Sequence, residues 1–163
     1  MSHVWWANSA LSSSPTEIRD APYRYCWRMA TILAHITVKP GKEREFEDLA
    51  ERLVKATHDN ETRVIRYEYW RGAEPNTYYG LLAFQDYNAF LEHQTSDHHE
   101  TDAKKMTGIF SDFKLEWLDP ITTASPLPAT NMQPLVDGAS DLWKAYHERM
   151  PAQVAAWWLG LRK

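Results

Sequence analysis

The stretch Ile32–Val54, ILAHITVKPGKEREFEDLAERLV, contains the two periodicities from which the fold can be predicted. Over residues 31–38 apolar side chains recur at every second position, which is typical of a strand with one buried face. Pro40 and Gly41 then give a turn signal. From Phe46 onward, apolar residues recur at spacings of three and four, opposite charged side chains, and this predicts an amphipathic helix. We therefore expect a strand, a tight turn and a helix that packs back onto the strand.

Further elements follow on the C-terminal side. Residues 60–70 and 77–84 predict two more strands around the turn AEPN, and residues 110–118 predict a fourth. Asp86 is a suitable N-cap for a helix, and another helix is expected after Ser96–Asp97. The resulting order, β-α-β-β-α-β, is that of an α+β, ferredoxin-like fold. Helices would cover one face of this sheet, so we expect a homodimer that forms through the other face.

The chain is predicted to have three parts. Residues 1–29 are a turn-rich N-terminal arm, residues 30–120 form the α+β domain, and residues 121–163 are a linker followed by a Trp-rich C-terminal helix. This last helix is predicted over roughly residues 139–161, where Pro151 would kink or divide it. Such aromatic extensions are expected to pack on their own domain, on a second subunit or over a pocket.

Composition restricts the partners. The 163 residues carry a formal net charge of −4 and no basic run, so we expect no nucleic-acid partner. No apolar run is long enough to span a membrane, and neither a signal peptide nor a membrane contact is expected. A single cysteine, Cys26, excludes an intrachain disulfide and fits a cytoplasmic location.

The segment Leu91–Glu100, LEHQTSDHHE, holds three of the seven histidines. The spacing of His93 and His98 is one residue longer than the i,i+4 spacing that places two ligands on one helix face, so we expect no metal here. A break between two helices is expected instead, with Ser96 as cap or with Asp97 and Glu100 as a capping box.

Helical periodicity predicts where the imidazoles point. His99, Ala103 and Met106 share a face, so His99 is expected to point toward the core and His98 outward, toward Asp102. His93 is expected at the margin of the apolar face of the preceding helix.

The position of His98 and His99 also suggests chemistry. They fall in the first turn of a helix, where the dipole disfavours an imidazolium, and a neutral imidazole is suited to act as a base. His35 on the first strand could converge with them, near Tyr67 and other tyrosines of the sheet. The alternative, that each histidine is an ordinary packing or surface residue, stays open.

Two stretches, Ile32–Val54 and Tyr69–Glu100 (YWRGAEPNTYYGLLAFQDYNAFLEHQTSDHHE), resemble the antibiotic biosynthesis monooxygenase (ABM) family. The resemblance covers about residues 30–120 and implies a dimeric α+β barrel. His93 and His98 match two family positions, whereas His99 stands where the family usually has an apolar residue.

The quinone-forming members of the family, which oxidise anthrones without a cofactor, have an Asn, a Trp and a Tyr in and after the third strand. This chain has Gly80, Phe84 and Phe90 at those positions. The chain is also similar to the stress-responsive barrels, which include polyketide cyclases; His35 and His98 (or His99) match their histidine pair. The haem-degrading branch is a third relative, but its strand-three Trp is absent.

We therefore expect a cofactor-independent monooxygenase of a small electron-rich aromatic or quinol-type compound, with no cofactor. Alternatives are a non-redox lyase, isomerase or cyclase acting by acid–base chemistry, and a haem- or ligand-binding dimer. The predicted catalytic residues are His99, His98 and His35. The predicted substrate-binding residues are His93, Tyr67, Tyr69, Tyr78, Phe84, Phe90 and Trp70.

Overall fold

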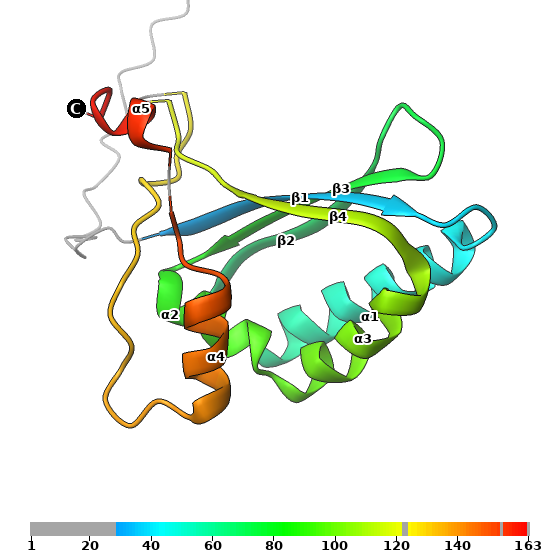
Figure 1. The fold of residues 1–163 in the computed structure, drawn as a ribbon, viewed down its shortest axis with the longest axis horizontal. Helices are drawn as coiled ribbons and strands as arrows, with labels where there is room; N and C mark the ends of the chain where they lie inside the picture. The colour runs from blue at the N-terminus through cyan, green and yellow to red at the C-terminus, as the bar shows by residue number, and fades with distance from the viewer. Residues whose placement is uncertain (1–28, 122–123, 154, 163) are drawn as a thin grey trace, which may run out of the picture.

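The computed structural model describes residues 29–121, 124–153 and 155–162 (Figure 1). Apart from Met29, the predicted N-terminal arm lies outside these residues. The elements of the domain are β1 (Ala30–Val38), α1 (Glu43–Asn60), β2 (Val64–Arg71), β3 (Thr77–Phe84), α2 (Tyr87–Gln94), α3 (Asp97–Ile109) and β4 (Phe110–Trp117). None of the helices in the described ranges has the length and apolar content needed to cross a membrane.

The four strands form one antiparallel sheet in the order β2-β3-β1-β4. Because β1 lies between β3 and β4, the chain makes the two crossovers of the ferredoxin-like fold through its helices. The predicted α+β fold and element order are confirmed, including the break between α2 and α3. Helices α1, α2 and α3 all lie on one side of the sheet (Figure 1).

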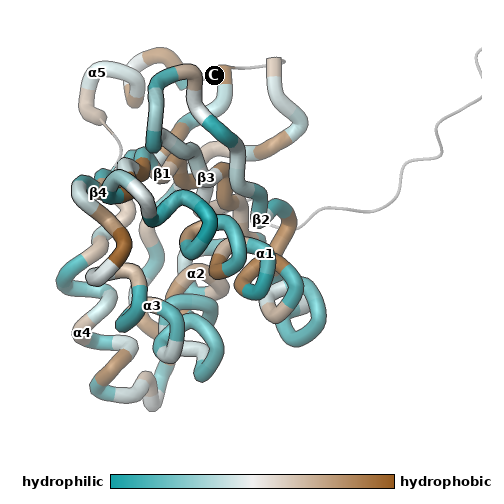
Figure 2. Tube along the Cα trace, turned by 90° about the vertical axis from the view of Figure 1, so that its right-hand side faces the viewer, coloured by the Kyte–Doolittle hydropathy of each residue, from teal (hydrophilic) through white to brown (hydrophobic). Residues whose placement is uncertain are grey.

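The core lies between the sheet and these helices. Ile32, Ala34 and Ile36 of β1 are buried on the helix side, and Phe46 and Leu49 of α1 pack against them in the same cluster. The helices alternate between hydrophobic and hydrophilic residues along their length, as Figure 2 shows. This is the pattern of helices that bury one stripe and leave the other in water.

The opposite, open face of the sheet is mixed in character. The cross-strand register places Trp70, Tyr79, His35 and Lys114 in one row across the four strands. Trp70 and Tyr79 are 59% and 37% exposed. In the same region His35 Nε2 lies 2.7 Å from Glu116 Oε2. The face thus combines apolar and ionic groups.

Two helices follow the domain. α4 (Asp141–Arg149) begins at the N-cap Ser140 and lies beside α2, whereas α5 (Ala156–Leu159) lies near the start of β1 (Figure 1). The predicted C-terminal helix is therefore divided next to Pro151, as expected. Arg162 after α5 pairs with Asp119 at 2.7 Å, which fixes this end of the chain to the end of the sheet.

Candidate functional site

A cavity of about 480 Å³, here called the inner cavity, lies between the sheet and helices α2, α3 and α4. Its apolar wall comes from the helix-facing residues of the strands, including Ile32, Ala34 and Leu82, and from Phe90 and Met106 on the helices. The polar side chains on its wall are those of Tyr67, Tyr69, His93, Gln94, His99, Thr107, Ser111, Asp112, Tyr146 and Arg149.

His99 points inward from the first turn of α3, as predicted, and is 9% exposed. The N-cap of α3 is Ser96, whose Oγ accepts from the His99 N–H, so the alternative capping box led by Asp97 is wrong. His99 Nδ1 donates to the carbonyl oxygen of Gln94 at 3.1 Å, because a carbonyl can only accept. Nε2 is then the unprotonated nitrogen. Burial lowers the pKa of His99 to about 3, and the neighbouring His93 adds to this.

His93 is one of the most deeply buried side chains of the domain, at 1% exposure, and the expected marginal position is wrong. Its ring packs against Tyr67, with centroids 4.7 Å apart, and edge-on against His99 at 4.8 Å. Nδ1 lies 2.9 Å from Glu61 Oε1. Burial, reinforced by His98, lowers the pKa of His93 to about 3, so the imidazole stays neutral.

His98 does not point toward Asp102 as expected. Its Nε2 lies 2.8 Å from Glu61 Oε1 and 3.2 Å from Ser96 Oγ, behind the cavity wall. Glu61 therefore holds two imidazoles with one carboxylate oxygen. Burial raises the pKa of Glu61, and the nearby His98 opposes that effect.

The spacing argument against convergence of the histidines is also wrong. The ligand atoms of Glu61, His93 and His98 lie within 4.8 Å of one another, because Thr95 and Ser96 break the helix between the two imidazoles. These three residues could hold a metal ion. Their N–O separations of 2.8 and 2.9 Å are equally those of two imidazole N–H groups that donate to one carboxylate.

Two tyrosines face the histidines from β2. The hydroxyl oxygens of Tyr67 and Tyr69 are 3.2 Å apart, and burial raises the pKa of both. Both phenols therefore remain protonated and can donate hydrogen bonds. Gly80 makes room for this arrangement, since a Cβ there would lie 3.2 Å from Tyr69 Cε1 and 3.3 Å from Ala34 Cβ. The Tyr69 ring thus occupies space beside the position where the quinone-forming relatives have an Asn.

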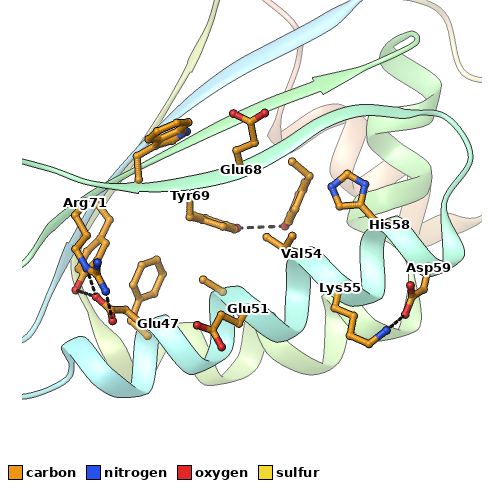
Figure 3. A pocket seen from close by; sticks show the side chains of 14 residues that line it. Glu47, Glu51, Val54, Lys55, His58, Asp59, Glu68, Tyr69 and Arg71 are labelled. Carbon is orange, nitrogen blue, oxygen red and sulfur yellow. Dashed lines mark hydrogen bonds and ion pairs between the residues drawn. The ribbon is translucent and has the colours of Figure 1, made fainter.

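A second, more open space of about 800 Å³, here called the outer groove, lies between α1 and β2 (Figure 3). It shares the wall formed by Tyr67 and Tyr69 with the inner cavity. Glu47 binds Arg71 through two 2.7 Å contacts. The Arg71 guanidinium lowers the pKa of Glu47 to about 2. Because this charged pair is already satisfied, the inner cavity is the better candidate for chemistry.

The predicted site residues are divided among five surroundings. His93, His99, Tyr67, Tyr69 and Phe90 line the inner cavity. Tyr78 and Trp70 instead border the outer groove, where Tyr78 donates to Glu47 at 3.0 Å, and Phe84 is packed in the core. His98 lies behind the wall, and His35 lies on the open face.

The expected convergence of His35 with His99 is therefore wrong. Successive residues of a strand point to opposite faces, so the burial of Ala34 and Ile36 against the helices puts His35 on the other side of the sheet. Trp70 is separated from the histidines for the same reason, because Tyr69 faces inward. Sequence reasoning also missed Glu61, which no motif indicates.

The fold and cavity define an α+β ferredoxin-like domain with an internal, partly polar pocket. Residues 29–105, just under half of the chain, match the family model described as Antibiotic biosynthesis monooxygenase (ABM), and this segment is therefore similar to that family. No curated protein gave a significant match.

Solved structures support the fold. A candidate antibiotic biosynthesis monooxygenase from Caulobacter crescentus CB15 is 24% identical, with 60% of this chain and 93% of that chain covered and a TM-score of 0.56. Another such candidate, from Bacteroides thetaiotaomicron VPI-5482, is 17% identical, with 65% and 97% covered and a TM-score of 0.56. The structure of Rv0793 from Mycobacterium tuberculosis is 16% identical, with 60% and 99% covered and a TM-score of 0.55. At these identities the likeness establishes the fold alone.

Proposed function

We propose that the inner cavity is the active site of a cofactor-independent monooxygenase that acts on a small electron-rich aromatic compound. One observation carries this proposal: two neutral imidazoles are anchored through Nδ1, His93 to Glu61 and His99 to a carbonyl oxygen, on the wall that also bears the Tyr67 and Tyr69 hydroxyls. The similarity to the ABM family is consistent with it. A base beside a hydrogen-bond donor is what the formation of a phenolate or enolate requires.

The proposed base is His99, because it is the more accessible of the two imidazoles. A substrate hydroxyl or acidic C–H would give its proton to Nε2, and the Tyr67–Tyr69 pair would donate to the resulting oxyanion. Burial keeps the imidazole neutral, so that Nε2 has a lone pair that can accept a proton, but the pKa of about 3 makes it a weak base in the empty cavity. The substrate anion formed next to it would raise this pKa by stabilising the imidazolium. His93, held by Glu61, fixes the position of the His99 ring.

The oxygen step needs no further group. An anthrone-like carbanion reacts with O₂ to give a hydroperoxide at the same carbon. Loss of water then leaves a carbonyl group, so that one oxygen atom is retained and the other leaves as water. The four electrons come from the CH₂ group of the substrate, and the apolar wall keeps bulk water from the anion.

The test is oxygen consumption with a panel of anthrones and quinols, measured in an oxygen electrode. His99→Ala is expected to lower turnover by about 100-fold or more. His58→Ala, which removes an exposed imidazole from the outer groove, should leave it unchanged. Substrate turnover without oxygen uptake would contradict the oxygenase and favour a lyase, isomerase or cyclase that uses the same imidazole.

We further propose that two copies pair through their open sheet faces. Trp70 and Tyr79 are the exposed aromatic residues of that face, and exposed aromatics of this size are typical of interfaces. His35 would then belong to the interface rather than to the active site. Light scattering is expected to give a dimer for the wild-type chain and a monomer for Tyr79→Arg, and a wild-type monomer would contradict the pairing.

A further inference from the structure

The C-terminal extension contributes side chains to the inner cavity. The family match ends at residue 105, yet Tyr146, Arg149 and Met150, at the end of α4, all line the cavity. The cavity of this chain is therefore bounded in part by residues outside the matched segment.

Specific contacts hold α4 in this place. The Tyr87 hydroxyl on α2 donates to the carbonyl oxygen of Met150 at 3.1 Å, and its ring packs edge-on against His147 at 5.7 Å. The Tyr146 hydroxyl donates to the Glu100 carboxylate on α3, and Tyr146 is buried. Helix α4 is thus tied to both helices that carry the cavity histidines.

The charge of Arg149 has no carboxylate partner within the part of the chain that the structure describes. Its guanidinium carbon lies 4.3 Å from the centre of the Tyr146 ring, which supports it from one side. By contrast, Arg71 and Arg162 each form bidentate contacts with a carboxylate. The acidic residue that lines the same cavity is the exposed Asp112 of β4, and Glu100 accepts a hydrogen bond from Tyr146.

We infer that Arg149 forms an anion subsite and that the substrate is an aromatic compound carrying a carboxylate. A planar guanidinium on the wall of an aromatic-sized cavity matches the two oxygens of a carboxylate through paired N–H donors. The aromatic ring of the substrate would lie against the apolar wall, with its hydroxyl group toward His99. This inference rests on the proposed function, because it names the substrate class of the same cavity.

The experiment compares two ligands that differ only in the carboxylate, 2,5-dihydroxybenzoate and benzene-1,4-diol, by calorimetric titration under anaerobic conditions. The wild-type chain is expected to bind the carboxylate at least about 10-fold more tightly. Arg149→Met keeps an aliphatic stem over Tyr146 and should abolish that difference while leaving the affinity for the diol within about 2-fold. Arg149→Lys, which keeps the charge, should retain part of the preference for the carboxylate over the diol.

Arg52→Met is the matched control. Arg52 is also an exposed arginine without an ion pair among the described residues, but it lines neither the inner cavity nor the outer groove. The Arg52→Met variant should bind 2,5-dihydroxybenzoate and benzene-1,4-diol with the same affinities as the wild type. Equal wild-type affinity for both ligands, no binding of either, or an equal loss for both in Arg149→Met would each overturn the subsite.

A carboxylate preference in the titration, together with no oxygen uptake from the anthrone panel in the oxygen electrode, would leave the subsite intact and contradict the monooxygenase. Oxygen uptake with an anthrone but no carboxylate preference in the titration would support the monooxygenase and contradict the subsite.

Discussion

The inner cavity and the outer groove share the wall formed by Tyr67 and Tyr69, but the groove holds a pair of charged side chains and the imidazoles of the cavity are neutral. In the groove, a carboxylate and a guanidinium meet at 2.7 Å and stay ionised near water. In the cavity, burial keeps His93 and His99 neutral. The comparison teaches that a carboxylate and a guanidinium that pair with each other are already engaged, whereas a buried neutral imidazole keeps a lone pair that can accept a proton.

The largest expected difference between the two regions is in pH dependence. The folded-state pKa values of His93 and His99, about 3, lie below the usual 6.5, so the unfolded chain binds more protons below pH 6.5. The contribution of these two groups to the free energy of unfolding is therefore fully present above pH 6.5. It falls as the pH drops toward 3, by up to about 1.4 kcal/mol per pH unit for each group. Urea unfolding at pH 7, 6, 5 and 4 measures this slope.

His99→Phe should make the slope about half as steep, because one of the two groups is removed. His58→Gln, which removes the exposed imidazole of the groove, should leave it unchanged. A wild-type stability that is flat between pH 7 and pH 4 would contradict the neutral, buried imidazoles.

The next effect concerns the shared wall. Gly80→Ala places a methyl group against the Tyr69 ring and Ala34, so we expect a loss of about 1–3 kcal/mol in the free energy of unfolding and a lower turnover. Gly108→Ala is the matched control, since a Cβ there meets nothing within 4 Å and lies in helix α3. It should stabilise the chain by up to about 1 kcal/mol. Similar losses in both variants would argue against the crowding at Gly80.

A smaller effect is expected from the hydroxyls themselves. Tyr69→Phe should cost about 1 kcal/mol or less, because a typical hydrogen bond contributes about that much. Turnover should nevertheless fall by about 10-fold, since the donor to the oxyanion is lost. Tyr78→Phe, which removes a hydroxyl that donates to Glu47 in the groove, is the control and should leave turnover unchanged. If both variants turned over at the wild-type rate, the Tyr67–Tyr69 pair would have no role in catalysis.

The smallest effect belongs to the groove. The pKa of Glu47 lies at about 2, below the usual 4.5, so its contribution to stability is present above pH 4.5 and lost as the pH falls toward 2. Glu47→Gln should remove the loss of stability that Glu47 causes below pH 4.5. It should leave the slope of the free energy of unfolding against pH unchanged between pH 6 and pH 5. Thermal unfolding between pH 5 and pH 2 would detect the difference, and a changed slope above pH 5 would contradict it.

Much of the fold could be predicted because the strands and α1 each bury only one face. Alternation in β1 gives the inward residues, and the spacing of His99, Ala103 and Met106 gives the inward side of α3. The same reasoning fails for α2. Seven of its eight residues are buried, so its periodicity cannot separate an inner from an outer face. His93 was misplaced for that reason.

Other errors have different physical causes. The position of His35 follows from strand alternation once Ala34 and Ile36 are known to face the helices, so this one was avoidable. Glu61 and Arg149 were not predictable in the same way. Each is placed by contacts between segments far apart in sequence. Glu61, at the end of α1, contacts residues of α2 and α3, and Arg149 is carried by α4, which packs against α2. No local pattern encodes such contacts.

The break between α2 and α3 has a consequence for how this chain can change in length. Ser96 Oγ donates to the carbonyl oxygen of His93 at 2.8 Å and accepts from the His99 N–H, so one hydroxyl links the end of one helix to the start of the next. An inserted residue within α3 before His99 would rotate that imidazole by about 100°, out of the cavity. Insertions and deletions between Ser96 and His99 are therefore expected to remove His99 from the cavity wall.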